Sequence, residues 1–335
     1  MNNRTGRRMF GSIDVDQKSK ELLSKLDAYR IAHFGEMIDK FVECFEKYAE
    51  KIARMQQAGE KQSVAYINFS VLRTNILSKR HVIRIDAYDH GWYSDRVECS
   101  GEYEVGEIYQ WLDMFESVLE GARRQSGGHL TLLDVHTLVF EESNHYLLYV
   151  TEIIRAGMKK AAETENYRKI NRHEVFAVFV GSYQDQSHIV YKEDTTVKDA
   201  RIIKRFLQAK QQESYVYEFF DGLDLSEGDY ENKKIIFCSF SGSDLTGSSF
   251  KKSAMVGDNF QNAVLKDTDM GQIEAFDIDF GGAVLENVSF RGAKLNRLSF
   301  TGAKLTGVRF EDVSSAENIS FEGAELIDTV IPGIR

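Results

Sequence analysis

Hydrophobic residues in the last third of the chain recur at every fifth position. From Phe220 to Phe310 each fifth residue is apolar, and a second, usually smaller side chain such as Ala283 or Val308 lies two positions before it. Neither regular element fits this spacing, because positions five apart point to opposite faces of a strand and drift by about 140° around a helix. Gly, Asn or Asp recurs two positions after the large residue, where turns are favoured. The pattern predicts one turn of the chain per five residues.

A longer period of twenty residues predicts how these short segments stack. Residues twenty apart share their side-chain type in two columns, a third column is aromatic or Met, and a fourth is looser. After Ser315 the count slips by one residue, and the columns then continue. Like side chains at this spacing imply four short sides per coil, with each coil buried against the next. The predicted core is a phenylalanine column and a leucine column: Phe220, Phe240, Phe260, Phe280, Phe300 and Phe321, and Leu225, Leu245, Leu265, Leu285, Leu305 and Leu326.

Several five-residue segments resemble the A-(D/N)-L-x-x units of the pentapeptide-repeat family. They are SDLTG at 243–247, AVLEN at 283–287 and AKLTG at 303–307. The resemblance implies a right-handed quadrilateral β-helix, a pentapeptide-repeat solenoid, over residues 215–335, and it implies little about biochemistry. Departures from the pattern are Ala275 and Ser315 in the fourth column and Asp258 at an inward position. We expect these residues to weaken the stack locally without breaking its register.

Residues 1–214 lack this period and carry no motif that identifies a family. Helical spacing alternates with runs rich in β-branched and aromatic residues. This region is therefore predicted to be a mainly helical α+β domain that precedes the β-helix. The expected elements are one or two helices over 14–55, strands over 62–88, helices over 104–124 and 130–165, a hairpin over 175–191 and a linking helix over 196–212.

Composition indicates a two-domain protein without a membrane segment. The 335 residues, 42% of them hydrophobic, can fill more than one core. No apolar run approaches the roughly 20 residues of a membrane span, and no apolar segment follows the basic N-terminus as it would in a secretory signal. Cys44, Cys99 and Cys238 lie far apart without metal-ligand spacing. We therefore expect a cytoplasmic protein with three reduced, structural thiols.

Negative charge is concentrated in the repeats. The whole chain has a formal net charge of −10, and from Asp221 onward 19 acidic residues face 11 basic ones. Because the apolar residues of the repeats point inward, these charges must lie on the exterior, where they repel nucleic acid. The sequence therefore predicts a protein partner with a basic surface and no direct binding of nucleic acid or membrane.

One segment of the N-terminal domain stands out as a candidate contact for a small molecule or peptide. The run DAYDHGWYSD gathers polar and aromatic side chains in a predicted turn, and loops often carry function. The alternative is a structural turn whose tryptophan packs on the core. The candidate binding residues are Asp86, Asp89, His90, Trp92 and Asp95.

Patterns that indicate catalysis or metal binding are scarce. Glu142 and His145 have the spacing of half a di-iron site, but no second Glu-x-x-His exists. His33 and Glu36, in the reverse order, indicate a local pair on a helix. Phosphate loops, dinucleotide fingerprints, nucleophile elbows and Cys-x-x-Cys pairs are absent from the sequence. We expect no catalytic residue, metal site or cofactor, although missing motifs do not exclude an enzyme of unknown reaction.

Three functions are compatible with these features. We favour a non-enzymatic protein-protein interaction or scaffold protein that uses an acidic β-helix as its binding surface. The resemblance implies one alternative, because some pentapeptide-repeat proteins mimic duplex DNA and regulate a type II topoisomerase such as gyrase. The other is an enzyme in the N-terminal domain with the solenoid as its docking surface. The final coil, with Phe321, Leu326 and Ile331, also predicts a homodimer that forms through this end.

Overall fold

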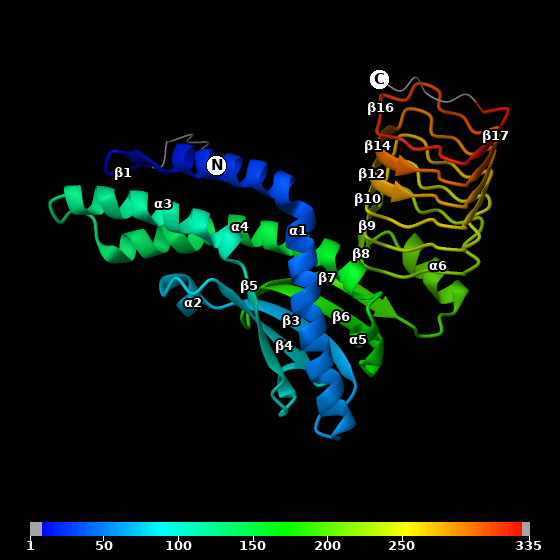
Figure 1. Cartoon of the computed structure of the whole chain (residues 1–335). Coiled ribbons are helices and arrows are strands. Elements are labelled where there is room, and N and C mark those ends of the chain that lie inside the picture. The colour runs from blue at the N-terminus through cyan, green and yellow to red at the C-terminus, as the bar shows by residue number, and fades with distance from the viewer. Residues whose placement is uncertain (1–8, 330–335) are drawn as a thin grey trace. The chain divides into compact units, whose positions relative to one another are not determined.

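The computed structural model describes residues 9–329, which fall into two compact units. An α+β unit, Met1–Thr195, precedes a β-helical unit, Thr196–Arg335 (Figure 1). This arrangement confirms the predicted fold class. Among the described residues, no helix combines the length and the apolar character needed to cross a membrane.

Helix α6 (Ala200–Gln208) belongs to the β-helical unit, so the boundary lies earlier than the predicted residue 214. Leu207 is buried in the same apolar cluster as Tyr215 and the first phenylalanine of the column. The Tyr215 hydroxyl donates to the carbonyl O of Phe206 at 2.7 Å. Lys233 Nζ donates to the carbonyl O of Ala209 at 2.8 Å. Helix α6 therefore covers the open end of the first coil.

A five-stranded sheet of order β5-β4-β3-β6-β7 forms the centre of the N-terminal unit (Figure 1). Strands β3 and β6 are parallel, and the other neighbouring pairs are antiparallel. Strands β1 and β2 form a separate two-stranded ribbon. In chain order the elements are β1 (Met9–Phe10), β2 (Ile13–Asp14), α1 (Val15–Gln57), β3 (Val64–Val71), α2 (Arg73–Leu77), β4 (Val82–Tyr88), η1 (Trp92–Ser94), β5 (Ser100–Glu104), α3 (Gly106–Gln125), α4 (Leu132–Ala161), α5 (Glu165–Lys169), β6 (Arg172–Ser182) and β7 (Ser187–Asp194).

The two long helices of this unit begin at capping residues. The Asp14 side chain accepts a hydrogen bond from the backbone N–H of Gln17 at 3.1 Å, and α1 then runs as one continuous helix. Thr131 and Asp134 form a capping box at the start of α4.

Strand β5 is absent from the sequence prediction because Tyr103 is its one buried side chain, so its apolar alternation is weak.

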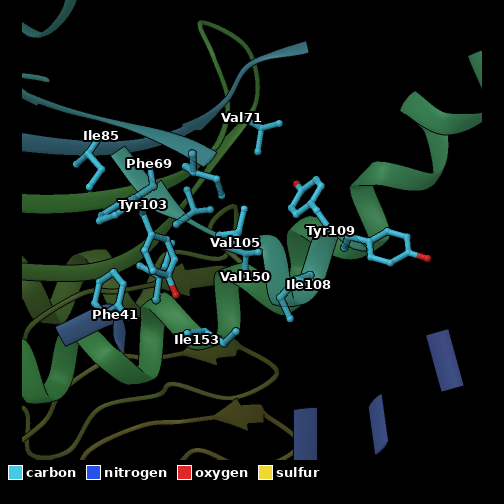
Figure 2. Packing of buried hydrophobic residues seen from close by; sticks show 14 of the residues in the cluster. Phe41, Phe69, Val71, Ile85, Tyr103, Val105, Ile108, Tyr109, Val150 and Ile153 are labelled. Carbon is cyan, nitrogen blue, oxygen red and sulfur yellow. The ribbon is translucent and has the colours of Figure 1, made fainter. Parts of the chain in front are cut away.

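The core of the N-terminal unit lies between one face of the sheet and helices α1, α3 and α4. Phe41 of α1 packs edge-on against Tyr103 of β5 with ring centroids 5.4 Å apart, and Phe69 of β3 lies 5.6 Å from Phe41 (Figure 2). A Cβ atom built on Gly157 of α4 would lie 2.2 Å from the Phe41 ring. Glycine at this position therefore allows the close approach of α1 and α4.

The C-terminal unit is a stack of coils in which parallel strands pair with partners twenty residues away. Met255 pairs with Ala275, and Leu265 pairs with Leu285. At the corners the backbone takes a positive φ, for example 66° at Gly242, as the recurring turn residues predict. The strands form one six-stranded and one four-stranded sheet: β8 (Ser214–Val216), β9 (Lys234–Ile236), β10 (Ala254–Val256), β12 (Glu274–Asp279), β14 (Lys294–Ser299) and β16 (Ser315–Glu317), and then β11 (Val264–Lys266), β13 (Val284–Glu286), β15 (Lys304–Thr306) and β17 (Glu325–Ile327).

From Phe240 onward the rings of the phenylalanine column stack with successive planes within 23° of each other. Phe280 and Phe300 lie 5.0 Å apart with their planes at 5°, and Phe321 continues the stack 5.1 Å beyond Phe300. Leu326, near the last described turn, is 37% exposed. Ile331 lies outside the described residues, so association through this end stays a prediction. Buried members of the two columns are Phe220, Phe240, Phe260, Phe280, Phe300, Leu225, Leu245, Leu265, Leu285 and Leu305.

The one-residue slip lies before Ser315, not after it. Ser315 pairs with Lys294, so Ala316 lies beside Leu295 in the fourth column. Ala316 is partly buried and packs against the apolar cluster of the β-helix. The prediction that Ser315 lies in the fourth column is therefore wrong, because the extra residue moves the serine to an outward position.

Asp258 is an acidic residue inside the β-helix. Asp258 is 1% exposed, and its Oδ1 accepts a hydrogen bond from the backbone N–H of Cys238 at 2.7 Å. Its Oδ2 has no hydrogen-bond partner in the described part of the chain. Burial raises the pKa of Asp258 well above its usual range. At an equivalent inward position, Ser253 accepts from the N–H of Lys233 at 3.0 Å and donates to the carbonyl O of Tyr230 at 3.1 Å.

We expect Asp258→Ser to stabilise the C-terminal unit by about 2 kcal/mol at pH 8, because it removes a buried, unpaired carboxyl oxygen. Serine can form the same two hydrogen bonds as Ser253. Since the folded-state pKa of Asp258 is raised, its contribution to stability is present below about pH 4 and is lost as the pH rises. The advantage of the variant should therefore be smaller at pH 5 than at pH 8.

Urea unfolding followed by circular dichroism at both pH values measures this difference. The matched control is Asp244→Ser, at an exposed outward position, which should change the unfolding free energy by less than about 0.5 kcal/mol. Equal effects of the two substitutions, or no dependence on pH, would show that Asp258 is not a buried titrating group.

Candidate functional site

The acidic residues of the candidate segment 86–95 already have partners within the N-terminal unit. Asp86 on β4 is buried and forms an ion pair with Arg84 at 2.8 Å. Asp89 accepts a hydrogen bond from the backbone N–H of Gly91 at 2.7 Å, which tightens the turn. Asp95 accepts from the backbone N–H of Asp89 at 2.8 Å. These carboxylates hold the loop in shape, and their role in binding stays a prediction.

Asp95 also forms a buried ion pair with Lys61, which follows α1. Lys61 Nζ and Asp95 Oδ2 lie 2.5 Å apart, and the two side chains are 1% and 3% exposed. Lys61 donates in addition to the carbonyl O of Val97 at 2.8 Å. Burial alone would raise the pKa of Asp95, but hydrogen bonds from Lys61 and from the backbone N–H groups of Val97 and Asp89 lower it. The sequence does not indicate that Lys61 is the partner of Asp95, because no pattern links two residues that lie 34 positions apart.

Trp92 packs on the sheet, but outside the apolar core on which the structural-turn alternative places it. Its ring lies 4.0 Å from that of Tyr66 on β3 and 4.8 Å from that of Phe179 on β6. The backbone of Trp92 has a φ of 53°, a conformation that is uncommon for a bulky residue. His90 lies next to it, with its ring 6.2 Å from that of His173. The loop that contains His90 and Trp92 therefore folds over the face of the sheet opposite the long helices.

Glu142 and His145 form a local pair on α4. Glu142 is buried; its Oε1 accepts from the Ser19 hydroxyl at 2.7 Å, and its Oε2 lies 3.3 Å from His145 Nδ1. Ser19 and His145 both contact the carboxylate, so this is not the serine-to-histidine order of a nucleophilic triad. No group of three or more potential metal ligands occurs within residues 9–329. The exposed pair of His33 and Glu36 is likewise local, at 3.3 Å.

A cavity of about 700 Å³ lies between helix α1 and the edge strand β5. One side of α1 from Met37 to Lys51, the whole of β5 and the first turn of α3 line it. Tyr103, Ile108 and Ile153, which also line it, are labelled in Figure 2. The sequence does not indicate this cavity, because its α1 wall reads as a charged, solvent-facing side and β5 is not predicted.

The chemical groups of this cavity suit binding better than catalysis. Cys44 of α1 donates its thiol to the carbonyl O of Glu102 at 3.4 Å, and burial raises the pKa of Cys44. The thiol is therefore protonated at neutral pH and is a poor nucleophile. Lys40 pairs with Glu107, and Lys47 pairs with Glu43. Backbone groups and fixed charges dominate the site.

The exterior of the β-helix carries charged side chains that pair between coils. Lys266 lies 3.4 Å from Glu286 twenty residues later, and Lys304 lies 3.5 Å from Glu325. Both pairs lie on the side of the coils that contains the leucine column. The coil geometry therefore sets polar side chains at regular spacing on a flat outer surface.

The family match lies within the C-terminal unit. A family model described as a pentapeptide repeat region matches residues 243–321, and no curated protein matches the chain. A pentapeptide repeat protein from the Arabidopsis thaliana thylakoid lumen is 27% identical over 31% of this chain and 62% of its own, with a TM-score of 0.16. The match thus spans about three fifths of that protein.

Two further solved structures are similar over about a third of this chain. A pentapeptide repeat protein from the cyanobacterium Cyanothece is 21% identical over 34% of this chain and 81% of its own, with a TM-score of 0.13. QnrB1, a plasmid-mediated fluoroquinolone resistance protein, is 19% identical over 34% of this chain and 60% of its own, with a TM-score of 0.14. The family match and the twenty-residue stacking of the coils agree. Residues 243–321 of the C-terminal unit therefore match the pentapeptide-repeat family, and the unit has the β-helical fold of such repeats.

Proposed function

We propose that the protein is a non-enzymatic interaction or scaffold protein whose β-helix binds a protein partner with a basic surface. One observation carries this proposal: on two adjoining sides of the coils, those of the phenylalanine and leucine columns, ten acidic residues face outward against two basic ones. The acidic residues are Asp221, Asp224, Glu227, Asp244, Asp267, Asp279, Glu286, Glu322, Glu325 and Asp328, and the basic residues are Lys266 and Lys304.

The other two sides are close to neutral. Their outward positions hold eight acidic and seven basic residues, so the excess of negative charge lies on one half of the rod's circumference. Both lysines of the acidic half are in ion pairs with glutamates, which leaves the remaining carboxylates to act on a partner. Such a one-sided field attracts a positively charged surface and orients it during association.

Binding through these sides is expected to weaken strongly when carboxylates of the leucine side are neutralised. The partner is first isolated by cross-linking and co-purification with the tagged full chain, and its affinity is then measured at several salt concentrations. The variant Asp224→Asn, Asp244→Asn, Asp267→Asn should bind at least about tenfold more weakly and show a shallower salt dependence.

A matched control removes the same charge from a neutral side. The variant Glu274→Gln, Asp277→Asn, Glu317→Gln should bind within about twofold of the original protein, because exposed charges away from the contact matter little. Equal losses in both variants, or an affinity that does not respond to salt, would contradict the proposal.

The DNA-mimic alternative makes a different prediction from the same acidic sides. A regulator of this kind would inhibit or protect a type II topoisomerase, so a gyrase supercoiling assay with and without the protein separates the two. Unchanged supercoiling at high protein concentration removes the alternative and leaves the general interaction proposal standing.

A further inference from the structure

The outer edge of strand β5 has backbone groups that face no further strand. Among the strands of residues 9–329, β5 is the terminal strand of its sheet and pairs only with β4. The N–H of Ala87 donates to the carbonyl O of Cys99 at 3.0 Å, and the N–H of Val105 donates to that of His81 at 2.9 Å. Because hydrogen-bonded pairs alternate in an antiparallel ladder, the backbone groups of residues 100, 102 and 104 point away from β4.

Side chains of α1 contact two of these outward carbonyl groups. Lys51 Nζ donates to the carbonyl O of Ser100 at 2.6 Å, and the Cys44 thiol donates to that of Glu102 at 3.4 Å. A lysine beside an exposed edge is a common protection against unwanted strand pairing. Neither contact involves the outward N–H groups of Glu102 and Glu104. Within residues 9–329 no hydrogen bond from these two groups is found, so they are donors along the edge.

The cavity described above runs along this edge. Every residue from Ser100 to Ile108 lines it, and its volume of about 700 Å³ is in the range of sites that hold ligands. At Gly101 the Tyr48 ring of α1 packs directly on the strand, because a Cβ atom there would lie 2.7 Å from the ring. Apolar side chains of Met37 and Ile153 are also in the lining. A strand of five residues, about 17 Å long, would match β5 in length and would pair with it at a spacing of about 4.8 Å.

The charges on the α1 wall of the cavity indicate which kind of side chain a bound segment would carry. Lys40 and Lys47 are neutralised by glutamates, whereas Lys51 forms no ion pair within the part of the chain that the structure describes. Its ammonium group contacts the carbonyl O of Ser100 instead. A carboxylate on the occupant would complete this site, because Lys51 is partly buried at the end of the cavity.

We propose that the β5 edge binds an extended segment of a partner protein, which adds a sixth strand to the sheet. Backbone hydrogen bonds to Glu102 and Glu104 provide the pairing, alternate apolar side chains enter the cavity, and an acidic side chain contacts Lys51. This mode of recognition uses main-chain groups for affinity and pockets for specificity. The inference concerns the N-terminal unit and does not depend on the function proposed for the β-helix.

A random 12-residue peptide library displayed on phage, selected on the full chain, tests the proposal. Selected peptides should alternate apolar and polar residues and carry Asp or Glu at a fixed position. In Glu102→Pro the outward N–H is lost, and we expect about tenfold weaker binding of the selected peptide by calorimetry. Glu102→Ala keeps the N–H and should bind within about twofold. Lys51→Met should weaken acidic peptides by about fivefold.

Proline is tolerated on the open side of an edge strand, so Glu102→Pro is expected to fold. Tryptophan fluorescence during thermal unfolding checks this, and hydrogen exchange of the unaltered protein provides a second readout that needs no variant. Bound peptide should slow the exchange of the Glu102 and Glu104 amides. The proposal is overturned if no sequence is enriched, if the peptide binds a folded Glu102→Pro equally well, or if these amides stay unprotected. A concentration-dependent dimer that Glu102→Pro abolishes would assign the edge to a second copy of the chain and would also overturn it.

Discussion

Replacing Phe280 with aspartate is expected to unfold the β-helix while the N-terminal unit stays folded. The Phe280 ring stacks between Phe260 at 5.1 Å and Phe300 at 5.0 Å and also meets Phe290 edge-on. The substitution removes these contacts and buries a charge without a partner, at a cost of more than about 5 kcal/mol. Since each coil is stabilised by its neighbours, a break in the middle uncouples both halves.

Thiol labelling can follow this unfolding specifically. Cys238 is 1% exposed inside the β-helix, so Phe280→Asp should add one rapidly reacting thiol. Tryptophan emission should change little, because Trp92 and Trp111 both lie in the N-terminal unit. The control Lys294→Asp alters an exposed ion pair and should cost less than about 1 kcal/mol. An unreactive Cys238 in Phe280→Asp would contradict the assignment of this column to the core.

Replacing Lys61 with methionine is expected to destabilise the N-terminal unit by about 3–5 kcal/mol, because it leaves the buried carboxylate of Asp95 without its counter-ion. The loop that positions Trp92 on the sheet should loosen at the same time. Urea unfolding followed by tryptophan fluorescence measures the loss. Since the folded pKa of Asp95 is lowered, its contribution is present at neutral pH and is lost as the pH falls below about 4. The difference in unfolding free energy between the original protein and Lys61→Met should therefore become smaller in acid.

An exposed ion pair of the same type provides the matched control. Lys47 and Glu43 lie 2.6 Å apart on α1, with 73% and 69% of their side chains exposed. Lys47→Met should change the unfolding free energy by less than about 1 kcal/mol, because exposed pairs are well solvated. Similar losses in the two variants would mean that the Lys61 pair is not shielded from water.

The fold of the two units could be predicted from the sequence to very different degrees. In the β-helix each coil repeats the same residue types at the same corners, so Leu265 and Leu285 could be placed side by side from their spacing alone. The N-terminal unit has no such repeat. Its long helices have a clear apolar side, but the parallel pairing of β3 with β6 joins segments about a hundred residues apart, such as Ile67 and Val178. Local patterns contain no information about such contacts.

The turn at residues 86–95 could be predicted from the sequence, but the partners of its side chains could not. The segment 86–95 is recognisable as a turn from its Asp, Gly and Trp residues, whereas the Lys61 contact comes from a distant loop. The sequence does not indicate the edge of β5, because the proposed binding there uses main-chain groups that every residue has. Lys51 and Cys44 on α1 read as ordinary surface positions until the strand beside them is known.

Helix α6 has a consequence for how this chain can change in length during evolution. Helix α6 closes the first coil, so coils can be gained or lost toward the C-terminal end of the β-helix but not at the end that α6 covers. Duplicating twenty residues would lengthen the rod and keep every column aligned. Inserting five would rotate all later sides by a quarter turn and redistribute the acidic half around the circumference, so whole coils are the natural unit of gain and loss.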